Sequence, residues 1–312
     1  MESARALGEI RDDQGFAALV ERLNDPETSE EVRLGSAMGV GKIGGDECIK
    51  VLIELLNDLD TVVNIRERCA HLLGKIGGRC GEALLERLKD PEEAEEIRKE
   101  SARALGNIGD HWCINALIER LKDTDEADEL RFMSARALGN IGGDWCINAL
   151  IERLNDTDEA DELRIMSARA LGNIRGDRCR EVLTERLNDS KEAEGLRMWS
   201  AYALGLIAGD RSSDILIARI ENQYTPAQVR VASVWALGLA QRSSRGCRAL
   251  NVLVECFKDQ NEGEEVRKWS ALALGAIGGD RIAKSLREQL IDPDTPKTVQ
   301  EAITASLGIV SA

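Results

Sequence analysis

SARALGNIGG (residues 134–143) decides the fold, because versions of this stretch recur along the whole chain. Its Leu-Gly step returns every 32, 33 or 37 residues, most often 33. The glycines in register are Gly8, Gly41, Gly74, Gly106, Gly139, Gly172, Gly205, Gly238, Gly275 and Gly308. Such a period is the signature of a solenoid, in which each unit buries its apolar face only against its neighbours. We therefore expect function to lie on a repeated surface and not in one deep catalytic pocket.

A single unit, residues 144–176, shows how the repeat predicts paired helices. Apolar residues recur at helical spacing over residues 145–155 and again over residues 162–174, with a polar acidic turn between them. Counting such pairs along the chain predicts an all-α, right-handed solenoid of nine to ten repeats over residues 1–312. It begins with a half repeat at residues 1–11 and has irregular repeats with an insert at residues 221–258. The N-terminal half repeat favours fusion to, or packing against, another domain.

The amino-acid composition restricts the kinds of binding partner and the cellular compartment that we expect. The 312 residues carry a net charge of −15, which disfavours non-specific binding to nucleic acid or to an anionic membrane. No apolar run reaches the roughly 20 residues that span a bilayer, and no secretory signal precedes the first repeat. Five of the eight cysteines occupy nearly one repeat position, where stacked helices are too far apart for disulfides. Reduced thiols and the absence of a signal predict a cytoplasmic protein.

A second ladder runs through the predicted turns, because an Asp precedes an Arg by eight residues in most units. The clearest pairs are Asp123 with Arg131, Asp156 with Arg164, and Asp189 with Arg197. Stacked Asp and Arg side chains can link the turns of adjacent units by charge-assisted hydrogen bonds. Together with SARALGNIG, this ladder resembles the HEAT-like repeat of the phycobilin lyase type. The resemblance implies a HEAT-like fold, and it leaves function open among lyases, chaperones, scaffolds and sensors.

The outward face of the predicted second helices changes character along the chain. Positions two, five and nine after each ladder Arg point away from the Ala/Leu/Ile face, and in HEAT-like arrays such positions line the concave surface. We expect the partner-binding residues there to be Met166, Trp199, Tyr202, Leu206, Trp235, Leu239 and Trp269, flanked by Arg103, Arg136 and Arg169. An exposed aromatic patch usually marks a binding site, although tight curvature would instead bury these rings between helices. Trp112 and Trp145 are predicted to pack between repeats.

Three functions remain open at this stage. The sequence shows no catalytic constellation and no metal-ligand cluster, so we predict a non-enzymatic scaffold or sensor array that binds a peptide or protein partner, without a cofactor or metal. The first alternative is a phycobilin lyase or chromophore chaperone, in which the aromatics hold a linear tetrapyrrole and Arg136 or Arg169 pairs with its propionates. The second alternative is nucleic-acid binding along the Arg stripe, which the net charge opposes. The insert at residues 241–248 adds Arg242, Arg245 and Arg248.

Overall fold

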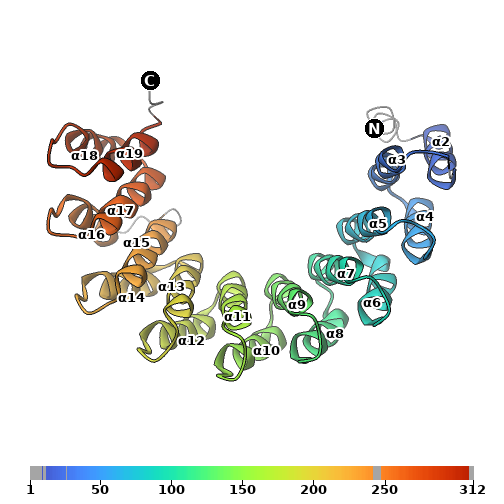
Figure 1. The fold of residues 1–312 in the computed structure, drawn as a ribbon, viewed down its shortest axis with the longest axis horizontal. Coiled ribbons are helices and arrows are strands. Elements are labelled where there is room, and N and C mark those ends of the chain that lie inside the picture. The colour runs from blue at the N-terminus through green and yellow to red at the C-terminus, as the bar shows by residue number, and fades with distance from the viewer. Residues whose placement is uncertain (1–8, 10–11, 26, 242–246, 309–312) are drawn as a thin grey trace. The chain divides into compact units, whose positions relative to one another are not determined.

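The computed structural model describes residues 9, 12–25, 27–241 and 247–308, and within them the chain is built from paired antiparallel α-helices (Figure 1). The first helices of the pairs are α2 (Asp13–Asn24), α4 (Asp46–Asn57), α6 (Gly81–Lys89), α8 (His111–Lys122), α10 (Asp144–Asn155), α12 (Asp177–Asn188), α14 (Asp210–Glu221), α16 (Cys247–Lys258) and α18 (Asp280–Leu290). The second helices are α3 (Glu30–Ile43), α5 (Val63–Ile76), α7 (Glu95–Ile108), α9 (Asp128–Ile141), α11 (Asp161–Ile174), α13 (Glu194–Ile207), α15 (Ala227–Gln241), α17 (Glu264–Ile277) and α19 (Lys297–Ser306). A short 3₁₀ helix, η1 (Gly78–Cys80), precedes α6.

The described residues form no β-strand, so the prediction of an all-α solenoid is confirmed. The right-handed sense of the superhelix stays a prediction. The chain divides into two compact units, Met1–Ala149 and Leu150–Ala312, which are described separately. The single array over residues 1–312 stays a prediction. Most of the predicted half repeat at residues 1–11, and Arg242 and Arg245 of the insert, lie outside the described residues.

Within each unit the second helices form one layer and the first helices the other (Figure 1). In the second unit, α11 packs on α13, α13 on α15, α15 on α17, and α17 on α19. We call the side of the second helices that faces away from the first helices the inner face. The buried core lies between the two layers and is made mainly of the Leu, Ile and Ala residues of the repeat.

The Ala-Leu-Gly step recurs because it sets how closely neighbouring second helices approach. A Cβ added to Gly205 would lie 2.6 Å from the carbonyl oxygen and 2.8 Å from the Cα of Ala236. The equivalent glycine Gly172 faces Ala203 in the same way, with its added Cβ 2.8 Å from the alanine Cβ. The glycine of one unit therefore packs against the alanine that lies two positions before the glycine of the next. Any larger side chain at either position forces the helices apart.

The ladder arginines bind the ends of the first helices. In eight units the Nε of this arginine donates to the carbonyl ten residues earlier, at 2.8–3.4 Å, as Arg164 does to Leu154. Those carbonyls belong to the last turn of a first helix, which has no intrahelical donor for them. Each arginine thus joins its own second helix to the preceding first helix.

The acidic partner of the ladder arginine differs from the expected one. Arg98 Nη1 and Nη2 donate to both carboxylate oxygens of Glu126 in the next turn, at 2.8 and 2.5 Å. Arg66 binds Glu93 and Arg230 binds Glu262 in the same way, while Arg164 donates to both oxygens of Glu192 from Nη2 alone. The predicted ladder of stacked Asp and Arg is therefore corrected to a ladder of Arg and Glu, in which Glu stands three residues after the Asp.

The aspartate of each turn has a local role. Asp123 closes α8, and its Oδ1 accepts a hydrogen bond from the backbone amide of Asp125 at 3.1 Å. Asp156 and Asp189 accept in the same way from the amides of Asp158 and Lys191, at 3.1 and 2.9 Å. Asp side chains favour such turns because a short carboxylate reaches the amide two residues on. The carboxylate is thereby used within its own turn.

Four ladder glutamates also bind an arginine of their own first helix, among them Glu159, which lies 3.3 Å from Arg153 Nη1. Arg120 Nη1 lies 3.2 Å from Glu126, Arg87 Nη1 lies 3.2 Å from Glu93, and Arg186 Nη1 lies 2.7 Å from Glu192. Each of these last three carboxylates is buried between two guanidinium groups. Burial alone raises the pKa of Glu126, but the hydrogen bonds and charge of Arg98 outweigh it, so the pKa is lowered overall.

Replacing Gly205 with Ala tests the close approach of the second helices. We expect the free energy of unfolding to fall by about 1–3 kcal/mol, because the added methyl meets backbone atoms of α15 that cannot move independently. Gly195→Ala on the same helix is the matched control, since its nearest neighbour would be the Ile165 side chain at 3.6 Å. In urea unfolding, the control should be neutral or slightly stabilising. Equal effects of the two substitutions would contradict the packing argument.

Glu126→Gln tests the corrected ladder. Removing one partner of a buried ion pair should lower the free energy of unfolding by about 3 kcal/mol near neutral pH. A lowered folded-state pKa means that the carboxylate stabilises the fold above its unfolded pKa, and that this stability is lost as pH falls through the folded pKa. The difference between wild type and variant should therefore shrink in acid. Glu129→Gln, which changes an exposed residue of α9, is the control and should have little effect at any pH.

Thiol reactivity tests the burial of the cysteine ladder. All seven cysteines with described side chains are free, and Cys48, Cys80, Cys113, Cys146 and Cys179 are buried at the starts of first helices. Burial raises the pKa of Cys69 and of Cys113 to about 12. We expect alkylation of the folded protein at mildly alkaline pH to be slow at these positions, because the thiolate is the reactive form. All eight thiols of the chain should react in denaturant. A smaller number there would reveal a disulfide.

Candidate functional site

An apolar groove lies on the inner face of the second unit, where α13, α15 and α17 run side by side. Its volume is about 340 Å³. The residues that line it are Met198, Trp199, Tyr202, Val231, Ala232, Trp235 and Trp269. Four of them are aromatic in a chain whose aromatic content is only 3%, so the local concentration of rings is high. All seven side chains keep part of their surface exposed.

The aromatic rings hold one another in fixed orientations. Trp199 and Tyr202, one helical turn apart on α13, meet edge to face with ring centroids 5.3 Å apart. Trp235 of α15 and Trp269 of α17 meet in the same way at 5.4 Å. Edge-to-face contact is the favourable geometry for aromatic pairs. The groove is therefore walled by two ring pairs that are partly immobilised before any ligand arrives.

Charged groups lie at both ends of the groove. The guanidinium carbon of Arg169, on α11, lies 4.6 Å from the centroid of the Trp199 ring. Arg169 is exposed and also donates to the Met166 sulfur at 3.7 Å. At the opposite end, the indole nitrogen of Trp269 donates to Glu265 at 3.2 Å. Glu265 also pairs with Lys268. The α11 end thus offers a cation that has no carboxylate partner among the described residues.

The structure brings together only part of the predicted binding set. Trp199, Tyr202, Trp235 and Trp269 line one groove, with Arg169 and Met166 beside it. Leu206 and Leu239 are half-buried on α13 and α15 but do not line the groove. Arg103 and Arg136 belong to the first unit, on α7 and α9. Met198, Val231 and Ala232 line the groove and were not predicted.

The two remaining tryptophans behave differently from each other. Trp112 packs against Gly81, where an added Cβ would lie 2.3 Å from the indole, as expected for a residue between repeats. The packing prediction is wrong for Trp145, which is 73% exposed. The residue of the next unit that corresponds to Gly81 is Ile114, a larger residue whose side chain is buried.

The first unit has a polar hollow on its inner face, of about 310 Å³. His71 Nδ1 lies 3.1 Å from the buried carboxylate of Glu100, and Arg103 pairs with the same carboxylate. Burial, followed by the nearby charge of Arg103, lowers the pKa of His71. Arg103 is therefore held by an internal partner and differs in this respect from Arg169.

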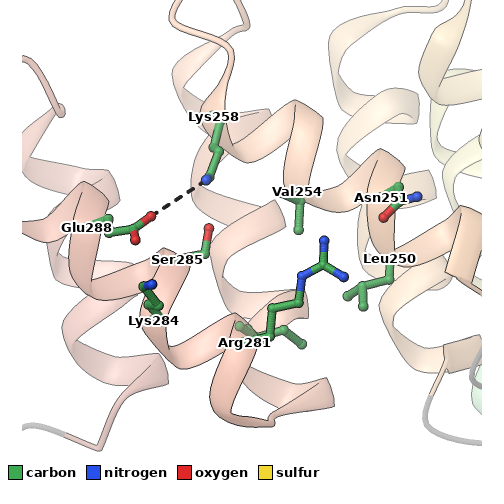
Figure 2. A pocket seen from close by; sticks show the side chains of 9 residues that line it. Leu250, Asn251, Val254, Lys258, Arg281, Lys284, Ser285 and Glu288 are labelled. Atoms are coloured by element: carbon green, nitrogen blue, oxygen red, sulfur yellow. Dashed lines mark ion pairs between the residues drawn. The ribbon is translucent and has the colours of Figure 1, made fainter.

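A further hollow of about 230 Å³ separates α16 and α18 on the side of the first helices (Figure 2). Its lining mixes apolar residues such as Leu250 and Val254 with charges of both signs. Figure 2 shows Lys258 directed toward Glu288, and the two groups are 3.8 Å apart. Arg248 of the insert is exposed on α16 and pairs with Asp214 at 3.0 Å. This mixed lining selects no ligand class as clearly as the aromatic groove does.

The described residues contain no group of three or more His, Cys, Asp or Glu side chains placed to hold a metal ion. No helix in the described part of the chain combines the length and the apolar character that a membrane crossing requires.

Comparisons with known proteins identify the family to which the repeat belongs. The family model described as HEAT repeats matches residues 1–64, 81–161, 147–226 and 223–308. Among solved structures, the chain is similar to human deoxyhypusine hydroxylase in complex with glycerol, at 22% identity over 97% of this chain and 98% of that one, with a TM-score of 0.40. It is similar to the CpcE–CpcF complex of phycocyanin lyase from Nostoc sp. PCC7120, at 15% identity over 86% and 96%, with a TM-score of 0.45.

The chain is also similar to Kap121p bound to Nup53p, at 14% identity over 94% of this chain and 36% of that one, with a TM-score of 0.43. No curated protein matches the sequence. Structural similarities at such low sequence identity do not identify a ligand for the groove. The family matches cover most of the chain and agree with the helix pairs of the structure, which confirms the HEAT-like resemblance. The chain therefore belongs to the family of HEAT repeat proteins.

Proposed function

We propose that this HEAT repeat chain is a non-enzymatic binding protein that holds a peptide segment of another protein in the groove of α13, α15 and α17. The observation that carries the proposal is the set of partly exposed aromatic rings lining one groove of about 340 Å³. Exposed apolar patches on a folded surface mark interaction sites, and Trp, Tyr and Arg are enriched among the residues that dominate binding energy.

The chemistry of the groove specifies the segment. Its apolar floor and walls take two or three apolar side chains, spaced to meet Trp199, Trp235 and Trp269 in turn. At the α11 end, Arg169 offers donors to a carboxylate, and its stacking on Trp199 fixes the plane of the guanidinium group. The occupant is therefore an apolar segment followed by an acidic residue. Because the ring pairs are already in contact, little side-chain freedom remains to be lost when it binds.

A peptide library tests this function. Phage-displayed peptides are panned on the full chain, and the recovered peptides are measured by fluorescence anisotropy. We expect apolar positions followed by Asp or Glu in the recovered sequences. Trp235→Ala should weaken binding at least about tenfold, because such an anchor contributes on the order of 2 kcal/mol. Arg169→Gln should reduce the preference for the acidic residue.

Trp145→Ala is the matched control, because this indole is exposed on α10 and lies outside the groove. Its binding should equal that of wild type. Equal binding by Trp235→Ala, with the variant still folded, would refute the proposal. So would a large loss of stability in that variant with binding intact, since the rings would then serve packing alone.

The same variants separate the alternative functions. In a chromophore chaperone or lyase, the rings would hold a linear tetrapyrrole and Arg169 would pair with a propionate. Biliverdin added to wild type would then change its absorbance, and Trp235→Ala would abolish the change. Labelled RNA tests the nucleic-acid alternative. We expect neither probe to bind.

A further inference from the structure

One rung of the Arg–Glu ladder lacks its acid. The turn between α14 and α15 reads Asn222-Gln223-Tyr224-Thr225-Pro226, so Thr225 stands where other turns carry the ladder glutamate. Asn222 stands where they carry the aspartate. Residues 222–226 therefore contain no acidic side chain.

Both arginines of this rung are nevertheless present. Arg197 on α13 occupies the position of Arg98 and Arg164, and Arg219 on α14 occupies the position of Arg120 and Arg186. In the complete rungs these two arginines bind one carboxylate between them, as Arg98 and Arg120 bind Glu126. Arg197 keeps its bond from Nε to the Leu187 carbonyl, at 3.2 Å. Its terminal nitrogens, and those of Arg219, have no hydrogen bond or ion pair with any described residue.

The threonine is left unsatisfied at the same place. Thr225 is only 6% exposed, and its buried hydroxyl has no hydrogen-bond partner among the described residues. Arg197 is only 8% exposed. A buried guanidinium without a counter-charge, and a buried hydroxyl without a partner, each cost free energy. By their repeat positions, two arginines and one hydroxyl thus surround the place where other rungs hold a carboxylate.

The other rungs with threonine differ from this one in their acidic groups or their arginines. Thr61 donates to Asp58 at 2.6 Å. Hydrogen bonds from Thr61 and the Asp60 amide, and further the charges of nearby arginines including Arg33, lower the pKa of Asp58. In the rung of Arg267, the Thr295 hydroxyl also has no hydrogen-bond partner among the described residues, but the turn retains Asp292 and the first helix has Gln289 where Arg219 would stand. Only the rung of Thr225 pairs two arginines with a turn that has no acid.

We propose that this rung is a binding site for a small monovalent anion, a halide or a simple carboxylate such as acetate. The anion takes the place of the missing glutamate carboxylate and accepts hydrogen bonds from Arg197, Arg219 and the Thr225 hydroxyl. Pro226 provides no backbone amide, so these three side chains are the donors. The site does not depend on the aromatic groove or on the function proposed for it.

Thermal unfolding at constant ionic strength tests the site. The isolated full chain is compared in sodium acetate and sodium chloride, with sodium gluconate, whose anion is much bulkier, as the reference salt. A ligand at about tenfold excess over its dissociation constant should raise the melting midpoint of wild type by about 3 °C relative to gluconate. No difference between the anions would overturn the proposal.

Two variants locate the effect. Thr225→Glu restores the ladder carboxylate, so the melting midpoint of this variant in gluconate should exceed that of wild type. The increment, which is the rise in midpoint caused by acetate or chloride, should vanish in this variant. Arg219→Gln should also lose the increment, and it decides the question if Thr225→Glu does not fold. Arg178→Gln, which removes the charge of an exposed arginine on α12, should keep it. An increment of equal size in all variants would show a general salt effect and would overturn the site.

Discussion

The contact between a glycine of one second helix and an alanine of the next is the constraint on which the rest of this structure depends. At Gly205 the helix axes approach until a single methyl group would overlap the backbone of Ala236. Such an approach excludes water from the seam and lets backbone atoms of neighbouring units touch directly. It also fixes the register between units, because only the Ala-Leu-Gly step offers two small residues at the right spacing. The recurring sequence follows from this geometry.

The pairing of charged residues in the turns follows from that register of the second helices. Once the second helices are stacked, each ladder arginine reaches the end of its own first helix, and those with a ladder glutamate also bind the turn of the next unit. The carbonyl of Leu154 and the carboxylate of Glu192 both bind Arg164, so one side chain joins three segments. Buried ion pairs of this kind stabilise little compared with apolar contacts, but they penalise any stacking that leaves the guanidinium unpaired. The ladder therefore contributes more to the specificity of the stacking between units than to the stability of the fold.

The sequence predicts the helices and most of the groove because both depend on spacing. Trp199, Tyr202, Trp235 and Trp269 were found by counting helical positions from the ladder arginine, and units in register bring such positions together. Met198 and Val231 were missed because they line the groove between helices, where the crossing of neighbours decides what is exposed. Glu126 was missed because two acids share each turn, and spacing alone does not show that Asp123 is used by its own backbone. The exposure of Trp145 was missed because a helical count treats Trp112 and Trp145 as equivalent, although Trp112 faces Gly81 and the corresponding residue of the next unit is Ile114.

A regular framework of this kind separates stability from recognition. The seam uses the glycine, alanine and serine positions of each second helix, and the ladder uses the arginine. The inner-face positions are left free to vary, so α11 carries Met166 and Arg169 where α13 carries Trp199 and Tyr202. Substituting them changes the surface while the spacing of the backbones is kept. The aromatic rings can then be held by one another on helices whose spacing the seam fixes, which is how an open surface becomes a preorganised one.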